Sequence, residues 1–361
     1  MHYQEVNSIK LNNETLAGEN LTEYCRMQLD TPYLDSWKES IYTFLLEWLD
    51  EMPTITTWTS GSTGEPKAIQ LKKQHMLNSA LKTGSHLDLK ENDKALLCLP
   101  AEYIAGKMML VRSMVLGLNL QISEPKNDPL KELEGTFDFA AMVPLQVHDI
   151  LQQANGYEKL NRVRKLIIGG GPVPLRLREK IAVLENEAYS TYGMTETVSH
   201  IAMERLNGPQ ADGYYHFPPR IEIENDEKDR LIIHAPDIAD EVIKTNDIVA
   251  LINERTFKVL GRYDNIINSG GIKIIPELIE KKLEKYISKR FIISSVPDEK
   301  LGEKVILVIE DKEWDENDIA VLQNAISGEL GKYEQPKWIE FISQFKETES
   351  GKVDRRRMKG K

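Results

Sequence analysis

The chain has 361 residues, of which 41% are hydrophobic and 29% are charged. This composition is that of an ordinary globular protein and excludes a disordered, collagen-like or coiled-coil chain, while the length predicts about two domains. The 46 basic and 57 acidic side chains give a formal net charge of −11. Because a broad nucleic-acid surface needs clustered Lys and Arg, we expect no nucleic-acid partner; a local basic pocket for a small anion stays open.

The two cysteines, Cys25 and Cys98, are too few for a disulfide framework or a zinc cluster, and we expect them to fill space in a reducing compartment. The first residues lack a basic start followed by an apolar run, so we expect no secretory signal. No stretch approaches the ~20 apolar residues of a membrane span. The sequence therefore predicts a cytoplasmic protein without membrane insertion, and it is compatible with an oligomer without indicating one.

The first part of the chain predicts one helix and one strand. Residues 35–50 indicate an amphipathic helix, because apolar side chains recur there at spacings of three and four. Residues 55–59 are rich in β-branched side chains and predict a strand, which a loop rich in Gly, Ser and Thr follows.

From residue 68 to about 262, short apolar runs alternate with helical patterns. The runs at 95–99, 139–143 and 165–168 predict buried strands. Each is followed by Gly or Pro and then by a helical stretch. This alternation predicts an α/β domain with a largely parallel sheet.

After Gly261 the pattern changes to that of a small α+β domain. Helices are expected at 276–286 and at 315–330, the second with Asp315 or Asn317 as its cap, and strands at 291–296 and 304–310. We therefore expect an N-terminal domain of residues 1–262 and a C-terminal domain of residues 263–361. The basic residues at the end of the chain are expected to form a solvated tail rather than a binding patch.

The strongest local signal is the segment 59–67, which is rich in glycines and hydroxyls. Glycines let backbone N–H groups converge on an anion, hydroxyls add donors and Lys67 supplies a charge, a combination that suits a polyphosphate. It is not a Walker loop, since Pro66 precedes the Lys and Ala68 follows it, and a flexible surface loop is the alternative. The candidate phosphate-binding residues are Thr59, Ser60, Gly61, Ser62, Thr63, Gly64 and Lys67.

Three further segments carry residues that suit a nucleotide. Gly169, Gly170 and Gly171 follow an apolar run, where a planar ligand can approach the backbone, although a tight strand-to-helix turn explains them equally well. The segment 189–197 offers an aromatic ring for a base, hydroxyls for a phosphate and a carboxylate for Mg²⁺, yet each of these residues alone is more often structural. Asp247 can accept two ribose hydroxyls.

Four segments, in this order along the chain, resemble the motifs of the adenylate-forming superfamily, which includes acyl- and aryl-CoA synthetases, luciferases and peptide-synthetase adenylation domains. The similarity runs from about residue 54 to the C-terminus. The segments are 59–67 (T-S-G-S-T-G-x-P-K), 192–196 (Y-G-x-T-E), 261–273 (G-R-x-D-x-x-I-x-x-G-G-x-K) and 350–352 (S-G-K). Within the superfamily, residues 192–200 are similar to the o-succinylbenzoate–CoA ligases of menaquinone synthesis, which typically read Y-G-M-T-E-T-x-S-Q; His200 departs from that Gln.

The resemblance implies a ligase that uses ATP, Mg²⁺ and coenzyme A on a small carboxylic acid, with o-succinylbenzoate as the expected acid. The carboxylate attacks the α-phosphorus of ATP to give acyl-AMP and pyrophosphate, and CoA then displaces AMP. Part of the N-terminal subdomain is expected to be abbreviated. The alternatives are another acyl- or aryl-CoA synthetase, an enzyme that loads a carrier protein, and a non-catalytic relative. Against the last of these, Lys67, Glu196, Asp247 and Lys352 are all present.

The resemblance also assigns roles to single residues. The catalytic residues are Lys352, which bridges carboxylate and phosphate, together with Thr195 and Glu196, the Mg²⁺ ligand. The ATP-binding residues beyond the phosphate loop are Gly169, Gly170, Gly171, Tyr192, Gly193, Asp247 and Arg262, with Tyr192 against the adenine and Asp247 on the ribose. For the second half-reaction the small domain is expected to swing about Asp264, and this brings Ser269, Gly270, Gly271 and Lys273 toward the thiol.

The acid pocket is expected near Ser199, His200 and Lys107. Lys107 would meet a second carboxylate of the acid if the helix after Gly106 lines the pocket. An ordinary solvated lysine is the alternative.

Overall fold

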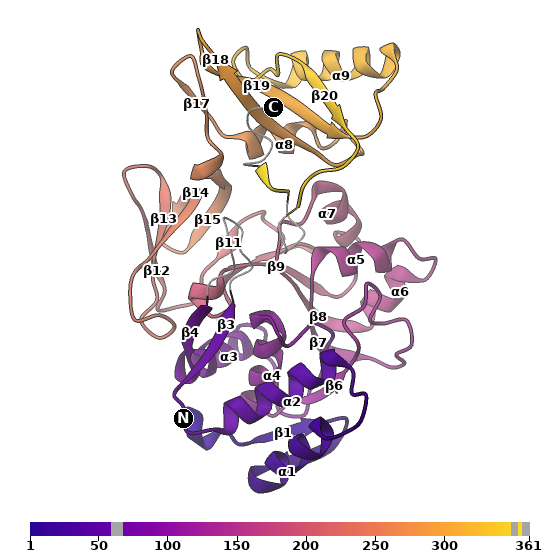
Figure 1. The fold of residues 1–361 in the computed structure, drawn as a ribbon, viewed down its shortest axis with the longest axis vertical. Coiled ribbons are helices and arrows are strands. Elements are labelled where there is room, and N and C mark those ends of the chain that lie inside the picture. Colours follow the sequence, from indigo (N-terminus) through magenta and orange to yellow (C-terminus); the bar gives the residue numbers. More distant parts are fainter. Residues whose placement is uncertain (59–67, 348–352, 356–361) are drawn as a thin grey trace.

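The computed structural model describes residues 1–58, 68–347 and 353–355. These residues form a sheet of thirteen strands, a second sheet of five strands and a separate antiparallel pair, β3–β4 (Figure 1). The strand order in the large sheet is β12-β13-β14-β15-β11-β10-β9-β8-β7-β5-β6-β1-β2. Its strands are β1 (Ser8–Leu11), β2 (Glu14–Ala17), β5 (Lys94–Leu97), β6 (Asn119–Ile122), β7 (Phe137–Met142), β8 (Val163–Ile168), β9 (Glu187–Gly193), β10 (His200–Arg205), β11 (Tyr215–His216), β12 (Glu222–Asn225), β13 (Arg230–His234), β14 (Ile243–Asn253) and β15 (Thr256–Arg262).

The expected α/β architecture is confirmed, and the large sheet divides into two halves. From β9 to β1 neighbouring strands are parallel, as the alternation of strands and helices predicts. From β9 through β10 and β11 to β12 all pairs are antiparallel. The sheet is therefore less parallel than expected, because turns and loops, and not crossover helices, join the strands after Gly193.

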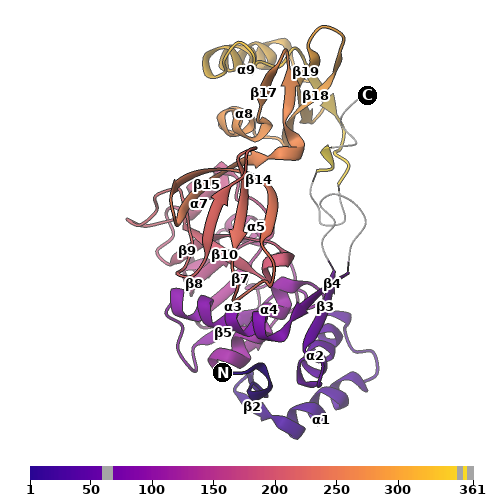
Figure 2. The same ribbon diagram turned by 90° about the vertical axis from the view of Figure 1, so that its left-hand side faces the viewer.

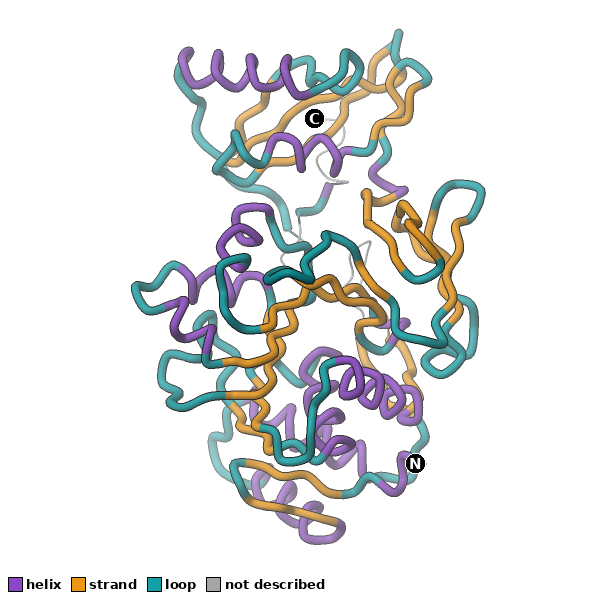
Figure 3. Tube along the Cα trace, turned by 180° about the vertical axis from the view of Figure 1, so that it is seen from behind, coloured by secondary structure: helices purple, strands orange, loops and turns teal. Residues whose placement is uncertain are grey.

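Helices cover both faces of the parallel half, as Figure 3 shows from behind. Successive residues of β5 and β7 point to opposite faces, so that Leu97 and Phe139 belong to one apolar cluster and Leu96 and Ala140 to another. Helices α1 to α4 pack on the first face and α5 to α7 on the second. Their bounds are α1 (Gly18–Leu29), α2 (Ser36–Leu49), α3 (Lys73–His86), α4 (Ile104–Leu116), α5 (Pro144–Leu151), α6 (Gly156–Asn161) and α7 (Leu175–Ile181).

The N-terminal residues fold onto this body. Helix α2 confirms the helix expected at 35–50, and its buried Trp48 donates a hydrogen bond to the carbonyl of Val6 (2.9 Å). Strand β1 pairs with β6, and α1 packs beside α2. Strands β3 (Thr54–Trp58) and β4 (Ala68–Lys72) form the separate pair. None of the helices in the described ranges combines the length and the apolar character that a membrane span requires.

The second sheet has the order β17-β16-β19-β18 with β20 beside β19, and α8 and α9 cover one of its faces (Figure 2). The predicted helices and strands are confirmed with small shifts of their ends, and Asp315 caps α9 by accepting a hydrogen bond from the amide of Asp318 (2.9 Å). The bounds are β16 (Ile267–Ser269), β17 (Ile272–Ile274), α8 (Pro276–Leu283), β18 (Phe291–Asp298), β19 (Gly302–Glu310), α9 (Glu316–Glu329) and β20 (Ile339–Ile342).

The two sheets meet at a junction with close contacts. The large sheet ends at Arg262, the short helix η3 (Tyr263–Asn265) follows, and the second sheet begins at Ile267. A Cβ on Gly261 would lie 2.3 Å from a carboxylate oxygen of Glu277 on α8, so only glycine fits there without a shift.

Residues up to Arg262, which contain the large sheet, are called the large body, and residues from Ile267 on, which contain the second sheet, the small body. Helix α7 of the large body receives its N-terminal cap from the small body. Pro174, at its N-cap position, has no side-chain hydrogen bond to offer. Glu284, next to the end of α8, instead accepts a hydrogen bond from the amide of Leu175 (2.9 Å). A carboxylate is favoured at this position because the first amides of a helix have no partner within it.

We expect the variant Glu284→Leu to lose protection of the first turn of α7. A lost N-terminal cap costs about 1 kcal/mol, or roughly a five-fold faster amide exchange. Hydrogen–deuterium exchange of a peptide covering α7 measures it. Glu284→Gln, which keeps an acceptor oxygen, is the matched control and should exchange nearly as slowly as the wild type. Equal protection in the wild type and the Leu variant would show that the contact is not a cap.

Candidate functional site

The glycines that follow β8 lie at the carboxyl edge of the parallel strands. Gly169 donates its amide to the carbonyl of Met142 (3.1 Å), and a Cβ on Gly169 would meet the hydroxyl of Thr191 at 2.4 Å. Gly170 has a φ of +85°, which favours glycine. Ligands bind outside the carboxyl ends of strands in open α/β sheets, so the exposed backbone here suits a flat ligand.

Tyr192, Asp247 and Arg262 form one hydrogen-bonded group. The hydroxyl of Tyr192 at the end of β9 donates to Asp247 Oδ2 (2.6 Å), and Arg262 Nη1 donates to Asp247 Oδ1 (3.2 Å). Asp247 and Arg262 are cross-strand partners on β14 and β15, which explains their contact. Burial, followed by the negative charge of Asp247, raises the pKa of Tyr192 well above its usual value, so the hydroxyl keeps its proton as a donor.

The ring of Tyr192 is held by other aromatic rings. It meets Phe257 edge-on at a centroid distance of 5.1 Å and lies tilted beside Tyr215 at 5.8 Å. The hydroxyl of Tyr215 is within 2.8 Å of Ser190 Oγ. The orientation of Tyr192 is therefore fixed by packing as well as by Asp247.

The turn after Gly193 presents Thr195 and Glu196 at the surface of the site. Both lie in the short helix η2 (Thr195–Thr197), which packs beside β4, the strand that follows residues 59–67. The buried Thr197 hydroxyl accepts from the amide of Met194 (2.9 Å) and contacts the carbonyl of Ser199 (2.7 Å). A Cβ on Gly193 would lie 2.3 Å from that carbonyl, so glycine is needed where β9 and β10 close on each other.

Glu196 has an exposed carboxylate with no hydrogen bond or ion pair to another residue in the described part of the chain. Val198 follows with a φ of +64°, a strained conformation for a β-branched residue. Strain of this kind gathers at functional sites.

Ser199 and His200 lie together, and a residue that the sequence did not single out joins them. Arg112 on α4 donates through Nη2 to Ser199 Oγ (2.6 Å), and the same nitrogen lies 3.5 Å from His200 Nδ1. The side chain of Arg112 is only 2% exposed, and burial lowers its pKa to about 9. No carboxylate lies within 4 Å of its guanidinium among the residues that the structure describes.

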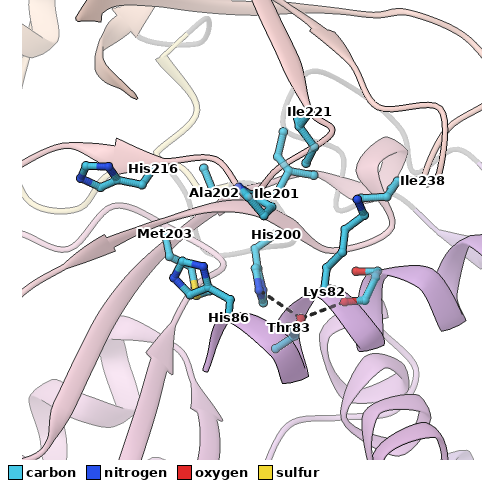
Figure 4. Close-up of a pocket in the computed structure, with 12 residues that line it drawn as sticks. Lys82, Thr83, His86, His200, Ile201, Ala202, Met203, His216, Ile221 and Ile238 are labelled. Carbon is cyan, nitrogen blue, oxygen red and sulfur yellow. Dashed lines mark hydrogen bonds between the residues drawn. The ribbon is translucent and has the colours of Figure 1, made fainter. Parts of the chain in front are cut away.

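His200 also borders a cavity between α3 and β10 (Figure 4). Its Nε2 lies 3.3 Å from the hydroxyl of Thr83, and His86 and His216 line the same cavity. Arg112 and Ser199 do not line the cavity, so His200 and Thr83 form the wall between it and the guanidinium.

Lys107, the third residue expected at the acid, points elsewhere. Its ammonium lies over the ring of Phe44 (4.9 Å to the centroid) and 4.0 Å from Glu47, between α4 and α2. Burial lowers its pKa, an effect that Glu47 opposes. It has no hydrogen bond or ion pair with Ser199 or His200 in the described ranges.

In the small body, residues 269–273 form a hairpin. Ser269 pairs with Ile272 across Gly270 and Gly271, whose φ values of +60° and +82° are those of a two-residue turn that needs glycine. Gly270 donates to the carbonyl of Leu301 (2.8 Å), and the Lys273 side chain is exposed.

Asp264, the expected hinge, contacts the large sheet. It accepts from Asn246 Nδ2 (3.2 Å) and lies 3.7 Å from Arg262.

Two groups of predicted residues lie outside the described part of the chain: the phosphate loop at 59–67 and Lys352. Neighbouring residues are described. Strands β3 and β4 flank the loop in sequence, and a bridge between Glu347 and Val353 flanks residues 348–352.

Comparison with known proteins agrees with this picture. Residues 37–232 match the model of the AMP-binding enzyme family. A 2-succinylbenzoate–CoA ligase of Listeria monocytogenes is 28% identical over 340 residues, which cover 87% of this chain and 72% of the relative. A Bacillus subtilis o-succinylbenzoate CoA synthetase, solved with the acyl-adenylate OSB-AMP, has the same fold, with a TM-score of 0.76 at 19% identity, covering 98% of this chain and 95% of that one.

A second solved structure is more similar in sequence. It is an acyl-CoA synthetase (AMP-forming)/AMP-acid ligase II-like protein from Dyadobacter fermentans, with 37% identity, a TM-score of 0.62, and coverage of 93% of this chain and 97% of that one. The family match, residues 37–232, spans more than half of the chain. The chain therefore belongs to the AMP-binding enzyme family.

Proposed function

We propose that the chain is an ATP-dependent acid–CoA ligase that converts o-succinylbenzoate to its acyl-AMP and then to its CoA thioester. The observation that carries this proposal is the buried guanidinium of Arg112, which has no carboxylate partner in the described residues and lies against Ser199. A buried cation of this kind is stabilised by an anion that arrives with a ligand. An acid with two carboxylates can react through one and pair the other with Arg112.

The nucleotide is assigned to the edge formed by the glycines after β8 and by Tyr192. From the described residues, Asp247 accepts one hydrogen bond at each oxygen. A carboxylate has about four acceptor sites, so two remain for ribose hydroxyls. Arg262 donates to that carboxylate and orients it. Lys67 and the other residues of 59–67 supply donors to the phosphates, in keeping with their motif.

Glu196 suits Mg²⁺ because its carboxylate is exposed and unpaired among the described residues. Magnesium prefers oxygen ligands and takes only one or two carboxylates beside substrate phosphates, so a single Glu fits. The ion supplies charge neutralisation at the phosphates. In this proposal Thr195, beside Glu196 on η2, donates its hydroxyl to a phosphate oxygen.

The chemistry opposes two anions, because a carboxylate must approach a polyphosphate. In this proposal Lys352 reaches the reacting groups and offsets the repulsion, while Tyr192, Asp247 and Arg262 fix the ribose. For the second half-reaction the domain of residues 263–361 rotates on the domain of residues 1–262 about Asp264. The hairpin with Ser269, Gly270, Gly271 and Lys273 then faces the thiol of CoA.

A single assay with matched acids tests the function. We expect o-succinylbenzoate to support ATP–pyrophosphate exchange and, with CoA, thioester formation. 4-Oxo-4-phenylbutanoate, which lacks the ring carboxylate, should have a much higher KM. Equal use of both acids would contradict the role of Arg112, and no exchange with any acid would contradict the ligase. Thioester formation only on a carrier protein would change the acceptor.

The variant Tyr192→Phe should raise the KM for ATP about ten-fold, because it removes a hydrogen bond to a charged group that is worth about 1.5–3 kcal/mol. The ring and its packing on Phe257 remain. Initial rates of exchange against ATP concentration measure the effect. Tyr215→Phe, which alters the same aromatic cluster without touching Asp247, is the control. Unchanged ATP kinetics in Tyr192→Phe would show that this hydroxyl does not organise the ribose site.

A further inference from the structure

Arg112, His200 and Thr83 form a closed network of side chains behind Ser199. Arg112 Nε lies 3.4 Å from Thr83 Oγ1, Arg112 Nη2 lies 3.5 Å from His200 Nδ1, and His200 Nε2 lies 3.3 Å from the same Thr83 oxygen. Thr83 Oγ1 is 3.0 Å from the carbonyl of Ser79, one turn earlier on α3. Three elements, α3, α4 and β10, thus meet in this network.

The positions of the protons follow from the chemistry of the partners. A guanidinium has only donors, so His200 Nδ1 must accept, and in a neutral ring Nε2 then carries the hydrogen. Nε2 donates to Thr83 Oγ1, which also accepts from Arg112 Nε and gives its own proton to the carbonyl of Ser79. A hydroxyl has one donor and two acceptor sites, so Thr83 is fully used.

Burial and the neighbouring positive charges keep the imidazole of His200 neutral. Burial lowers the pKa of His200 well below its usual value, and the positive charge of Arg112 on α4 and the nearby His86 on α3 lower it further. A protonated imidazole would have no acceptor for Arg112 and would repel it. His216, on β11, lines the same cavity without a hydrogen bond to this network in the described ranges.

We propose that His200 is a positioning residue: it accepts a hydrogen bond from Arg112 and donates one to Thr83, and so fixes the plane of the guanidinium at the acid site. The proposal rests on the function proposed above and deepens it. Nε donates to Thr83, and the two N–H groups of Nη2 point to His200 and Ser199, so the plane of the guanidinium is fixed. Nη1, which lies 3.9 Å from Met109 Sδ, is the nitrogen left to meet the acid. Ser199 Oγ accepts from Nη2 and keeps its own proton to donate to the acid.

The two hydrogen bonds of His200 predict which substitutions keep the network. An amide offers one acceptor oxygen and one donor nitrogen, the same pair that a neutral imidazole offers through Nδ1 and Nε2. His200→Gln should therefore preserve the network, whereas His200→Leu keeps a similar volume and removes both polar atoms.

Kinetics of five variants, one of them a control, test the proposal. His200→Leu and Thr83→Val should each raise the KM for o-succinylbenzoate about ten-fold, with the KM for ATP unchanged, because Arg112 loses a hydrogen bond that fixes it. His200→Gln and Thr83→Ser should stay within about two-fold of the wild type. His216→Gln, which changes a histidine of the same cavity outside the network, is the control and should be unchanged.

A spectroscopic measurement separates positioning from a merely structural effect. In ¹⁵N-histidine-labelled enzyme we expect the His200 ring to stay neutral between pH 6 and 8 with its hydrogen on Nε2, and Thr83→Val to change its nitrogen shifts. A hydrogen on Nδ1, a protonated ring, or equal acid KM values in His200→Leu and His200→Gln would overturn the proposal. If the wild type instead shows no exchange with any acid, the ligase function fails, independently of the network that the spectrum reports.

Discussion

An enzyme in which Lys352 is replaced by Ala should form acyl-AMP about 10²-fold more slowly or worse, and should still convert supplied acyl-AMP to the thioester. The reason is electrostatic. The first half-reaction brings a carboxylate against a polyphosphate, and one ammonium lowers that repulsion in a site of reduced dielectric. The second half-reaction has a thiol and no such pair of anions. ATP–pyrophosphate exchange measures the first half, and thioester formation from synthetic acyl-AMP measures the second.

Lys346→Ala is the matched control for this variant. Lys346 is exposed in the same part of the chain, and its backbone carbonyl, which the substitution keeps, accepts the amide of Asp354 (2.8 Å). Both half-reactions should be unchanged in it. Equal damage to both halves in Lys352→Ala would contradict a role restricted to adenylation and, with it, the rotation about Asp264.

Replacing Arg112 with Gln should raise the KM for o-succinylbenzoate about 10²-fold, because truncation of one partner of a buried charge pair costs about 2–5 kcal/mol. The KM for ATP should change little, since Tyr192, Asp247 and Arg262 form a separate group. 4-Oxo-4-phenylbutanoate, which has no second carboxylate, should lose nothing. Steady-state exchange kinetics with both acids give the comparison.

The variant Arg112→Lys separates the effect of the positive charge from that of the guanidinium geometry. It keeps a positive charge but loses the planar fork that reaches Thr83, Ser199 and His200 together, so its KM should lie between those of the wild type and Arg112→Gln. A thermal unfolding curve of each variant shows whether the fold is kept. If Arg112→Gln binds the diacid as well as the wild type does, the guanidinium has a structural role alone.

The sequence predicts the elements whose pattern is complete within their own residues. Helix α2, with its apolar stripe, and helix α9, with Asp315 as cap, match the expectations to within a residue at each end. The buried strands β7 and β8 are also predicted, because runs of apolar residues need no partner to be recognised.

The antiparallel half of the large sheet was not predicted, because its strands depend on partners far away in the sequence. Strand β11 has two residues, Tyr215 and His216, and exists because β10 and β15 pair on its two sides. Strand β1 likewise depends on β6, more than a hundred residues later. Short strands of this kind take their conformation from tertiary contacts, and a local pattern does not reveal them.

The sequence also did not show which basic residue of α4 lies at the candidate site. Lys107 and Arg112 are five positions apart, which places them about 140° apart around a helix. Only one of them can face Ser199, and it is Arg112. The helix is buried on nearly all sides, so its sequence has no polar face to show which direction is functional. An Arg inside an apolar helix was the available signal.

The cap that Glu284 provides to α7 couples the order of residues 169–175 to the arrangement of the two bodies. The amide of Leu175 donates to Glu284 where residues 263–361 lie against the large sheet. Leu175 also follows the glycines 169–171, the edge that the proposed function assigns to the nucleotide. By reciprocity, whatever orders residues 169–175 must favour this arrangement of the two bodies by the same factor as the arrangement favours that order. Under the proposed function, adenine at this edge biases the orientation of the domain of residues 263–361 through the contact between Leu175 and Glu284.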